Sequence, residues 1–348
     1  MIFEEWIKKN QKLHYLLKAY KHRNDKEYVE FFLNRETNPI LLEFLTKGNM
    51  YPDKRFFVIR ENGKGWGFFA EFRAMLAKLI FAERFCMTPY IDWGKEFLYT
   101  EEQEINHTMN AFEYYFLQPG TYKKSDIDCA KYVTFSKSVQ GEIIEKEYVV
   151  DNNIYNISYE YESVLAEIYR KYIHFNATTE QHINQEISTL IQGKSVLGVH
   201  YRGTDYKVGY NLHPVYVKIE QVIEEVKIAL DKYPFEKIFL ATDEIAAVER
   251  FKSEFGDKVL VYNDVYRGET EVSIAFSQAN RANHHYRLGY EVIRDMYTLS
   301  VCTGLIAGMS QVTNIARVAK RARKEEYKYF QLMNNGLNHN ECSFKGKL

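Results

Sequence analysis

The segment Ser195–Lys207, SVLGVHYRGTDYK, constrains the fold most, because its short apolar run ends abruptly in a polar cluster. Val196–Val199 is typical of a buried strand, and Gly203–Asp205 is typical of the turn that closes one. A helical pattern then runs from His213 to Lys232. Ligands bind just beyond the carboxyl ends of strands in open α/β sheets. The polar cluster follows the carboxyl end of a predicted strand and is therefore a candidate ligand site, although a salt-bridged turn would also explain it. Its members are His200, Arg202, Asp205 and Lys207.

The same alternation continues towards the C-terminus. Lys237–Ala241 and Lys258–Tyr262 read as strands with a helix, Ile245–Phe255, between them. Leu305–Gly308 is a last short strand, and a helix follows from Ser310 to Arg323. Strands separated by helices of this length form a parallel sheet with right-handed crossovers. We therefore predict an α/β chain whose C-terminal domain is a doubly wound parallel sheet.

The N-terminal half contains a predicted βαβ unit. Phe56–Ile59 and Tyr90–Trp93 read as strands, and Phe68–Ile80 carries apolar residues at helical spacing. The glycine-rich turn Gly63–Gly67 leads into that helix, an arrangement that offers backbone N–H groups to an anion. A glycine-rich loop alone is weak support for an anion site, since many such loops only turn the chain.

The segment between the two halves is predicted to contain the domain boundary. Residues 95–160 are irregular and aromatic, with a short predicted strand at Tyr148–Val150. Helices are expected over Ser163–Tyr172 and Thr179–Leu190, the second capped by Thr179. We expect surface helices within residues 1–50. The predicted regions are an N-terminal domain (1–178), a C-terminal domain (179–330) and a loose polar tail (331–348).

Composition and charge exclude several function classes. The chain has 46 basic and 47 acidic residues and a formal net charge of −1, so nothing favours nucleic acid as a partner. No apolar run is long enough to predict a membrane span. The first residues lack a basic lead and a cleavage site, so we expect a cytoplasmic protein. The four cysteines form no Cys-x-x-Cys pair, and Asp126-Ile127-Asp128 among lysines reads as a solvated loop. No metal site is predicted.

Polar residues follow three of the predicted C-terminal strands, at His200–Arg202, Thr242–Glu244 and Gly308–Gln311. Because these ends converge on one crevice in a doubly wound sheet, Asp243 joins the candidate nucleotide-binding residues. Ser310 stands at a helix N-cap, where its hydroxyl and the following N–H groups can hold a phosphate. Arg202 suits a forked contact with a diphosphate. Three unrelated caps and turns are the competing interpretation. The basic residues of the last helix read as a solvated face; they are Arg317, Lys320, Arg321, Arg323 and Lys324.

Four segments carry a family resemblance. They are GKGWGFFAEFRAMLAKLIFAERF (Gly63–Phe85), GVHYRGTDYKVG (Gly198–Gly209), IFLATDE (Ile238–Glu244) and SVCTGLIAGMSQVTNIARVA (Ser300–Ala319). The last three resemble the peptide motifs of the GDP-fucose-dependent α1,6-, α1,2- and protein O-fucosyltransferases, and most of all the nodulation-type α1,6 branch. The first is similar to the Gly-x-Gly helix segment in the acceptor half of that branch. The resemblance covers roughly residues 60–93 and 164–322.

The resemblance implies a GT-B fold, in which two Rossmann-like domains face a cleft, and an inverting, metal-independent transferase. It implies GDP-fucose as the donor substrate, no cofactor and a glycan acceptor, as in polysaccharide biosynthesis. Each residue named next matches one position of the family motifs, and its contact is the one that this position has in the family. The implied contacts are Arg202 to the β-phosphate, His200 and Asp295 to guanine, Ser310 and Gln311 to the diphosphate, and Gly67 and Phe68 as backbone donors.

The chain also departs from the family pattern. Gly203 follows Arg202 where the α1,6 enzymes have a second arginine, and Lys207 matches the family lysine only if Tyr206 is an insertion. Asn211 stands at the position of the proposed general-base glutamate. An inverting displacement needs a group that takes the proton of the acceptor hydroxyl. The replacement candidates are Asp205 and Glu71, with His213 behind them. A transferase using another GDP-sugar and a catalytically silent GDP- or glycan-binding protein are the alternatives.

Overall fold

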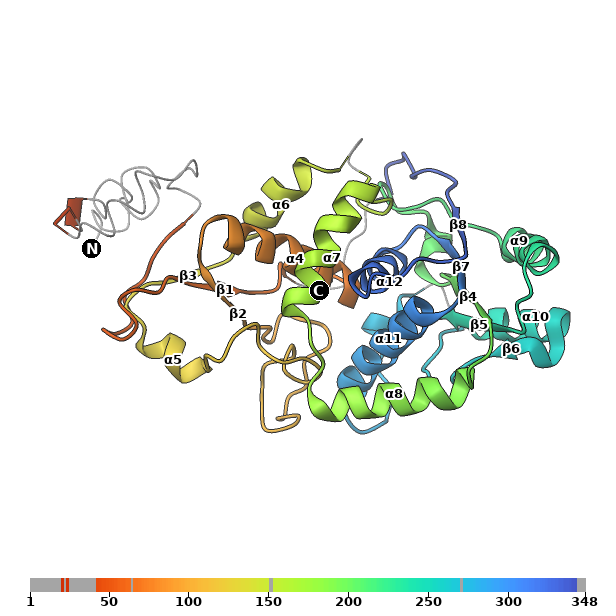
Figure 1. Cartoon of the computed structure of the whole chain (residues 1–348), viewed down its shortest axis with the longest axis horizontal. Coiled ribbons are helices and arrows are strands. Elements are labelled where there is room, and N and C mark those ends of the chain that lie inside the picture. Colours follow the sequence, from red (N-terminus) through yellow and green to blue (C-terminus); the bar gives the residue numbers. More distant parts are fainter. Residues whose placement is uncertain are drawn as a thin grey trace.

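The computed structural model describes residues 20–21, 23–24, 42–63, 65–149, 153–269 and 272–342. It contains two parallel sheets, each at the centre of its own α/β unit (Figure 1). The N-terminal sheet has the order β2-β1-β3, and β1 pairs in parallel with both neighbours. The strands are β1 (Phe56–Ile59), β2 (Thr88–Ile91) and β3 (Val133–Phe135). The βαβ unit predicted from the sequence is confirmed.

Helix α4 (Phe68–Arg84) is the crossover between β1 and β2 and is buried along most of its length. Its apolar side chains face the sheet on one side and helices α6 (Ser138–Lys146) and α7 (Tyr159–Tyr172) on the others. A helix that is apolar nearly all round belongs inside a protein. Burial on several sides therefore fixes the position of its N-terminal turn, which follows the glycine-rich loop.

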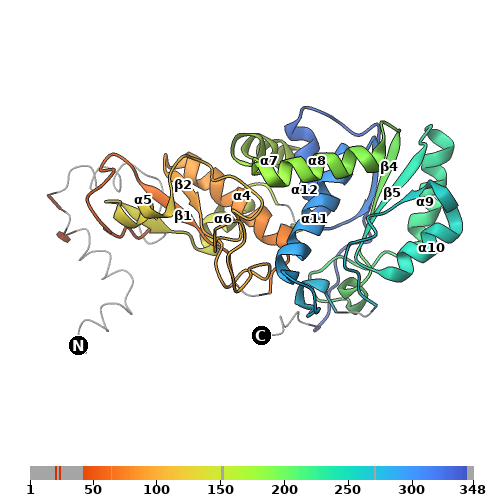
Figure 2. The ribbon, with the colours of Figure 1, turned by 90° about the horizontal axis from the view of Figure 1, so that it is seen from below.

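The C-terminal sheet has five parallel strands in the order β6-β5-β4-β7-β8. Every residue of the central strand β4 is buried. Helices α9 and α10 cover one face of this sheet, and α11 and α12 cover the face towards the N-terminal unit (Figure 2). This is the predicted doubly wound sheet. Its elements are β4 (Val196–Tyr201), α9 (Ile219–Lys232), β5 (Lys237–Thr242), α10 (Ile245–Phe255), β6 (Val259–Leu260), α11 (His284–Val301), β7 (Gly304–Gly308), α12 (Gln311–Ala322) and β8 (Tyr329–Met333).

The two units meet where α4 and α7 pack against α12. On α11, a side chain at Gly289 would place its Cβ 2.2 Å from the Tyr115 hydroxyl, so the close contact requires glycine there. The same hydroxyl donates to the Tyr286 carbonyl at 2.7 Å. The contact between the units is therefore built from closely fitted backbone and ring atoms.

The predicted solvated basic face of α12 is wrong for Arg317, Lys320 and Arg321, whereas Lys324 is exposed. Arg317 and Arg321 both pair with Glu162, a buried carboxylate on α7. Lys320 is also buried, and its ammonium donates to the carbonyls of Ser300 and Cys302 at 3.3 and 3.0 Å. These cations hold α12 to α7 and α11. The helical pattern alone could not reveal partners that come from distant parts of the chain.

Two predictions around residues 210 and 330 are also wrong, for one shared reason. The helix expected from His213 begins at Ile219, and the first residues of the expected loose tail, 331–333, complete strand β8. Before α9 the backbone turns aside and bonds to the C-terminal segment: Leu212 N–H to the Asn338 carbonyl at 2.8 Å and Val215 N–H to that of Gly336 at 2.9 Å. These long-range bonds compete with the helix and order the tail.

Smaller corrections fall in the middle of the chain. Tyr148 lies in a turn after α6 and in no strand, while Val150 is outside the described residues. Helix α8 (Ala177–Ile191) is capped by Asn176, whose side chain accepts from Thr179 N–H at 2.9 Å. The Asp126–Asp128 segment lies on the short helix α5 (Lys124–Cys129). Most of the surface helices expected within residues 1–50 fall outside the described residues.

Within the described ranges, no helix is long and apolar enough to cross a bilayer. The same part of the chain holds no group of three or more His, Cys, Asp or Glu residues with the geometry of a metal site.

Candidate active site

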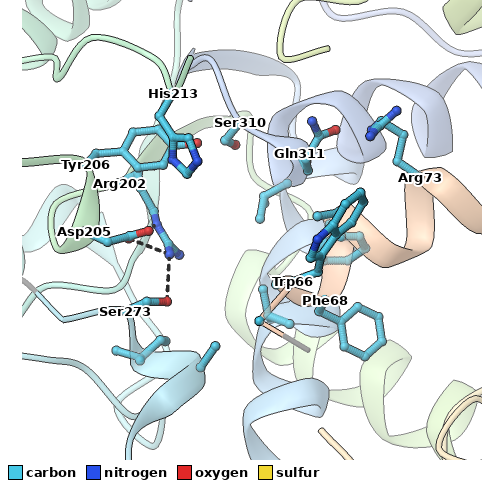
Figure 3. Close-up of a pocket in the computed structure, with 18 of the residues that line it drawn as sticks. Trp66, Phe68, Arg73, Arg202, Asp205, Tyr206, His213, Ser273, Ser310 and Gln311 are labelled. Carbon is cyan, nitrogen blue, oxygen red and sulfur yellow. Dashed lines mark hydrogen bonds and ion pairs between the residues drawn. The ribbon is translucent and has the colours of Figure 1, made fainter. Parts of the chain in front are cut away.

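A cavity of about 340 Å³ lies between the two units and is lined by both (Figure 3). The N-terminal unit contributes the end of the glycine-rich loop and the first turns of α4, from Gly65 to Arg73. The C-terminal unit contributes the end of β4, the segment around Ser273–Phe276, one side of α11 and the first residues of α12. Two parallel-sheet units facing a shared cavity are the GT-B arrangement that the motifs led us to expect.

His200, the fifth residue of β4, lies on the cavity wall as a buried neutral imidazole. Its Nδ1 lies 3.2 Å from both the Ser310 and the Thr313 hydroxyls. Burial, with a smaller contribution from the nearby Arg202 charge, lowers the pKa of His200 to about 4. At neutral pH this ring therefore acts through hydrogen bonds, without a positive charge.

Arg202 follows β4 and points into the cavity between two carboxylates. Its Nη2 donates to Asp205 at 2.7 Å, and its Nε lies 3.0 Å from Asp205 and 3.1 Å from Asp243. Nη2 also reaches the Ser273 hydroxyl at 3.3 Å (Figure 3). Burial lowers the pKa of Arg202, but the two carboxylates outweigh it and hold the pKa above its ordinary value. The guanidinium is fixed in place and permanently charged.

Steric crowding explains why a glycine, Gly203, follows Arg202. A Cβ at Gly203 would lie 2.1 Å from Oε2 of Glu244, and the Gly203 N–H donates to Asp243 at 2.9 Å. A second arginine at this position would have to displace the Glu244 side chain, which itself pairs with Lys207.

Two helix N-termini point into the cavity. Ser310 caps α12, its hydroxyl accepting from Thr313 N–H at 3.1 Å, and Gln311 begins the helix beside it. Gly67 stands at the N-cap of α4 without a side-chain cap, and the Phe68 N–H already donates to the Tyr99 hydroxyl at 3.3 Å. Free N–H groups and the helix dipole favour an anion at such ends. The cavity is therefore suited to a phosphorylated ligand.

Asp295 on α11 lines a smaller side cavity of about 50 Å³. That side cavity adjoins the main one, since both are lined by His200 and Arg202. Asp243 lines the side cavity as well. Burial raises the pKa of Asp295 to about 7, against the opposing charges of Arg294 and Arg267. A carboxylate in such a recess can accept two N–H bonds from a flat polar ring.

Two predicted catalytic residues do not line the main cavity. The Glu71 carboxylate is buried and accepts from Asn62 N–H at 2.9 and 3.1 Å, so it organises the glycine-rich loop. Lys207 pairs with Glu244 beyond the cavity wall. Asp205 is the one acidic residue among the described residues that line the cavity, and it is bonded to Arg202.

Sequence reasoning missed several residues that do line the cavity, although it named His213 as a candidate base. Tyr155, Tyr206 and His213 form an aromatic wall, with the His213 ring 5.9 Å from Tyr155 and 6.4 Å from Tyr206. Tyr99 and Arg73 line the side formed by the N-terminal unit. The signal for Arg73 was available, because an arginine interrupts the apolar pattern of a helix that is otherwise built to be buried.

No family model and no curated protein matches the chain. Solved structures do. NodZ α1,6-fucosyltransferase soaked with GDP-fucose is 19% identical, with 76% of this chain and 92% of NodZ covered and a TM-score of 0.47. Fucosyltransferase NodZ from Bradyrhizobium is 18% identical, with 76% of this chain and 93% of that structure covered and a TM-score of 0.42. POFUT1 in complex with GDP is 10% identical, with 80% of this chain and 98% of POFUT1 covered and a TM-score of 0.45. The chain is similar to these solved structures over about three quarters of its length.

Proposed function

We propose that this protein transfers fucose from GDP-fucose to a hydroxyl of a glycan, with inversion and without a metal cofactor. One observation carries the proposal: His200, Arg202, Ser310 and Gln311 line one cavity together with the uncapped start of α4. Asp295 lies in the adjoining recess. In this proposal residues 179–330 hold the donor and residues 1–178 form the acceptor side. The acceptor is an intermediate of polysaccharide biosynthesis in the cytoplasm.

Each group has a role in donor binding. Ionised Asp295 accepts two N–H bonds from guanine, which selects guanine over adenine, and neutral His200 contacts the same base. Arg202 and the N-terminus of α12 bind the diphosphate. When the glycosidic bond breaks, negative charge grows on that diphosphate, and fixed cations and N–H dipoles aimed at it lower the barrier.

His213 is the base that we assign to the acceptor hydroxyl. It lines the cavity, and burial lowers its pKa, so the imidazole is neutral and able to take a proton at pH 7. Asp205 is the second candidate, but it already pairs with Arg202. Asn211 has a structural role, since its side chain accepts from Asn340 N–H at 3.1 Å.

A donor panel tests the proposal. The protein is incubated with GDP-fucose, other GDP-hexoses and UDP-sugars, each with a set of glycan acceptors, and release of the nucleotide is followed. We expect turnover with GDP-fucose. Turnover with another GDP-sugar alone would contradict the fucose assignment and leave the guanine site standing.

The engagement of Asp205 by Arg202 favours one alternative, a protein that binds GDP or glycans without catalysis. Calorimetry separates the two. Micromolar binding of GDP with neither transfer nor hydrolysis of any donor would support the silent binder.

A further inference from the structure

Arg73 is a buried cation to which the proposed function assigns no role. It lies in the second turn of α4, its side chain is 2% exposed, and it lines the main cavity. Within the described residues the guanidinium has one partner, Glu145, which binds at Nη1. Its Nε is buried without a hydrogen-bond partner. Leaving a charged donor buried and unbonded is costly, and such an atom in a native protein calls for an explanation such as a functional role, a water or an ion.

The place of Arg73 indicates which ligand group would complete it. Helix α4 packs against α12, and Arg73 and Gln311 line the same cavity (Figure 3). Arg73 does not line the side cavity that holds Asp295. In a nucleoside diphosphate bound with its base at Asp295, the terminal phosphate is the one further from the base. That phosphate would lie at the end of the cavity where α12 begins.

The state of Arg202 favours a second guanidinium at the diphosphate. The edge of Arg202 formed by Nε and Nη2 already faces Asp205 and Asp243, which together outweigh its single positive charge. A forked contact with two phosphate oxygens uses that same edge of a guanidinium. In Arg73 the corresponding edge contains the unbonded Nε, since Glu145 is bound at Nη1.

We propose that Arg73, from the N-terminal unit, binds the terminal phosphate of the nucleotide diphosphate and stabilises it as the leaving group. It is a further binding residue for the same site, so the inference rests on the proposed function. It also gives the contact between the two units a role, because α4 must be held against α12 for Arg73 to reach this phosphate.

Calorimetric titration of GDP and GMP separates a terminal-phosphate contact from a general loss of structure. Arg73→Gln is expected to weaken GDP about tenfold or more, the loss of one charge-assisted contact, and GMP by less than about twofold. Arg73→Lys keeps the charge without the fork and is expected to lose less GDP affinity than Arg73→Gln. Arg84→Gln is the matched control, an arginine of the same helix that pairs with Glu147 at the surface, and both affinities should stay unchanged.

Two outcomes would overturn the inference: unaltered GDP affinity in Arg73→Gln, or equal losses for GDP and GMP. If GDP affinity is unaltered and the KM for the acceptor rises, Arg73 contacts the acceptor. If both variants fail to fold, the GDP complex of the unaltered chain decides, since Arg73 Nε must lie within hydrogen-bond distance of a terminal-phosphate oxygen. An unaltered chain that binds no GDP would instead overturn the proposed function.

Discussion

Arg202 sets the electrostatics of the cavity at the scale of single residues. Asp205 and Asp243 hold it in one geometry, so little reorganisation remains when the diphosphate becomes a leaving group. The same carboxylates reduce its net attraction for a bound anion. Positioning at Arg202 and added charge at Arg73 are therefore complementary.

Arg202→Ala tests this role. We expect kcat/KM for the donor to fall by a factor of about 10² to 10³, equivalent to ~2.7–4 kcal/mol of transition-state stabilisation. Turnover and thermal unfolding are both measured, with Arg287→Ala, an exposed arginine on α11, as the control. A variant that loses folding stability and keeps its turnover would show that Arg202 is a structural ion pair only.

Asp295 predicts the pH dependence of nucleotide binding. Its pKa of about 7 means that the ionised form, which accepts the guanine N–H groups, is lost as the pH falls below 7. GDP affinity should then drop by up to about tenfold per pH unit below that value. His200 does not titrate in this range, because its pKa is about 4.

Titrations between pH 5.5 and 8 test this dependence. Asp295→Asn should bind GDP weakly and show no such pH dependence. An unchanged pH profile in Asp295→Asn would contradict the assignment of this carboxylate to guanine.

At the scale of elements, the packing of α7 on α12 depends on one buried carboxylate. Glu162 on α7 receives both Arg317 and Arg321. Its loss removes the ion pair of Arg317 and leaves Arg321 with only a 3.8 Å pair to the exposed Glu326. Breaking a buried pair by removing one partner is strongly destabilising, whereas an exposed pair contributes little.

Glu162→Ala should therefore lower the free energy of unfolding by about 3 kcal/mol or more, measured by urea denaturation. Glu167→Ala, on the same helix in an exposed pair with Arg170, should cost less than about 1 kcal/mol. Equal effects of the two substitutions would contradict a structural role for the buried cluster.

The elements also show how far the sequence could lead. Helix α12 and strand β4 were predictable, because apolar spacing and a capping serine are local signals. The start of α9 was not, since residues 209–215 bond to a segment more than a hundred positions away. The site residues at strand ends were predictable, because ligands bind at the carboxyl ends of parallel strands. Arg73 could be noticed as an arginine in an apolar helix, but its place in the site and that of the aromatic wall depend on how two units pack, which no local pattern records.

At the scale of the whole molecule, the cavity belongs to neither unit alone, and a ligand bound across it should stabilise both together. GDP at a hundred times its Kd should add about 2.7 kcal/mol to the free energy of unfolding. The prediction is a rise in Tm with GDP and a much smaller one with ADP at the same concentration, measured by differential scanning calorimetry. Equal shifts with both nucleotides would remove the case for guanine recognition.

A crystal structure of the chain with GDP is the most direct test of the central claim that one cavity between the units grips a guanine nucleotide by base and diphosphate. The predicted result places guanine against the Asp295 carboxylate and the diphosphate between Arg202 and the start of α12. A nucleotide bound elsewhere, or bound in this cavity with its base away from Asp295 and its phosphates away from Arg202, would contradict the account.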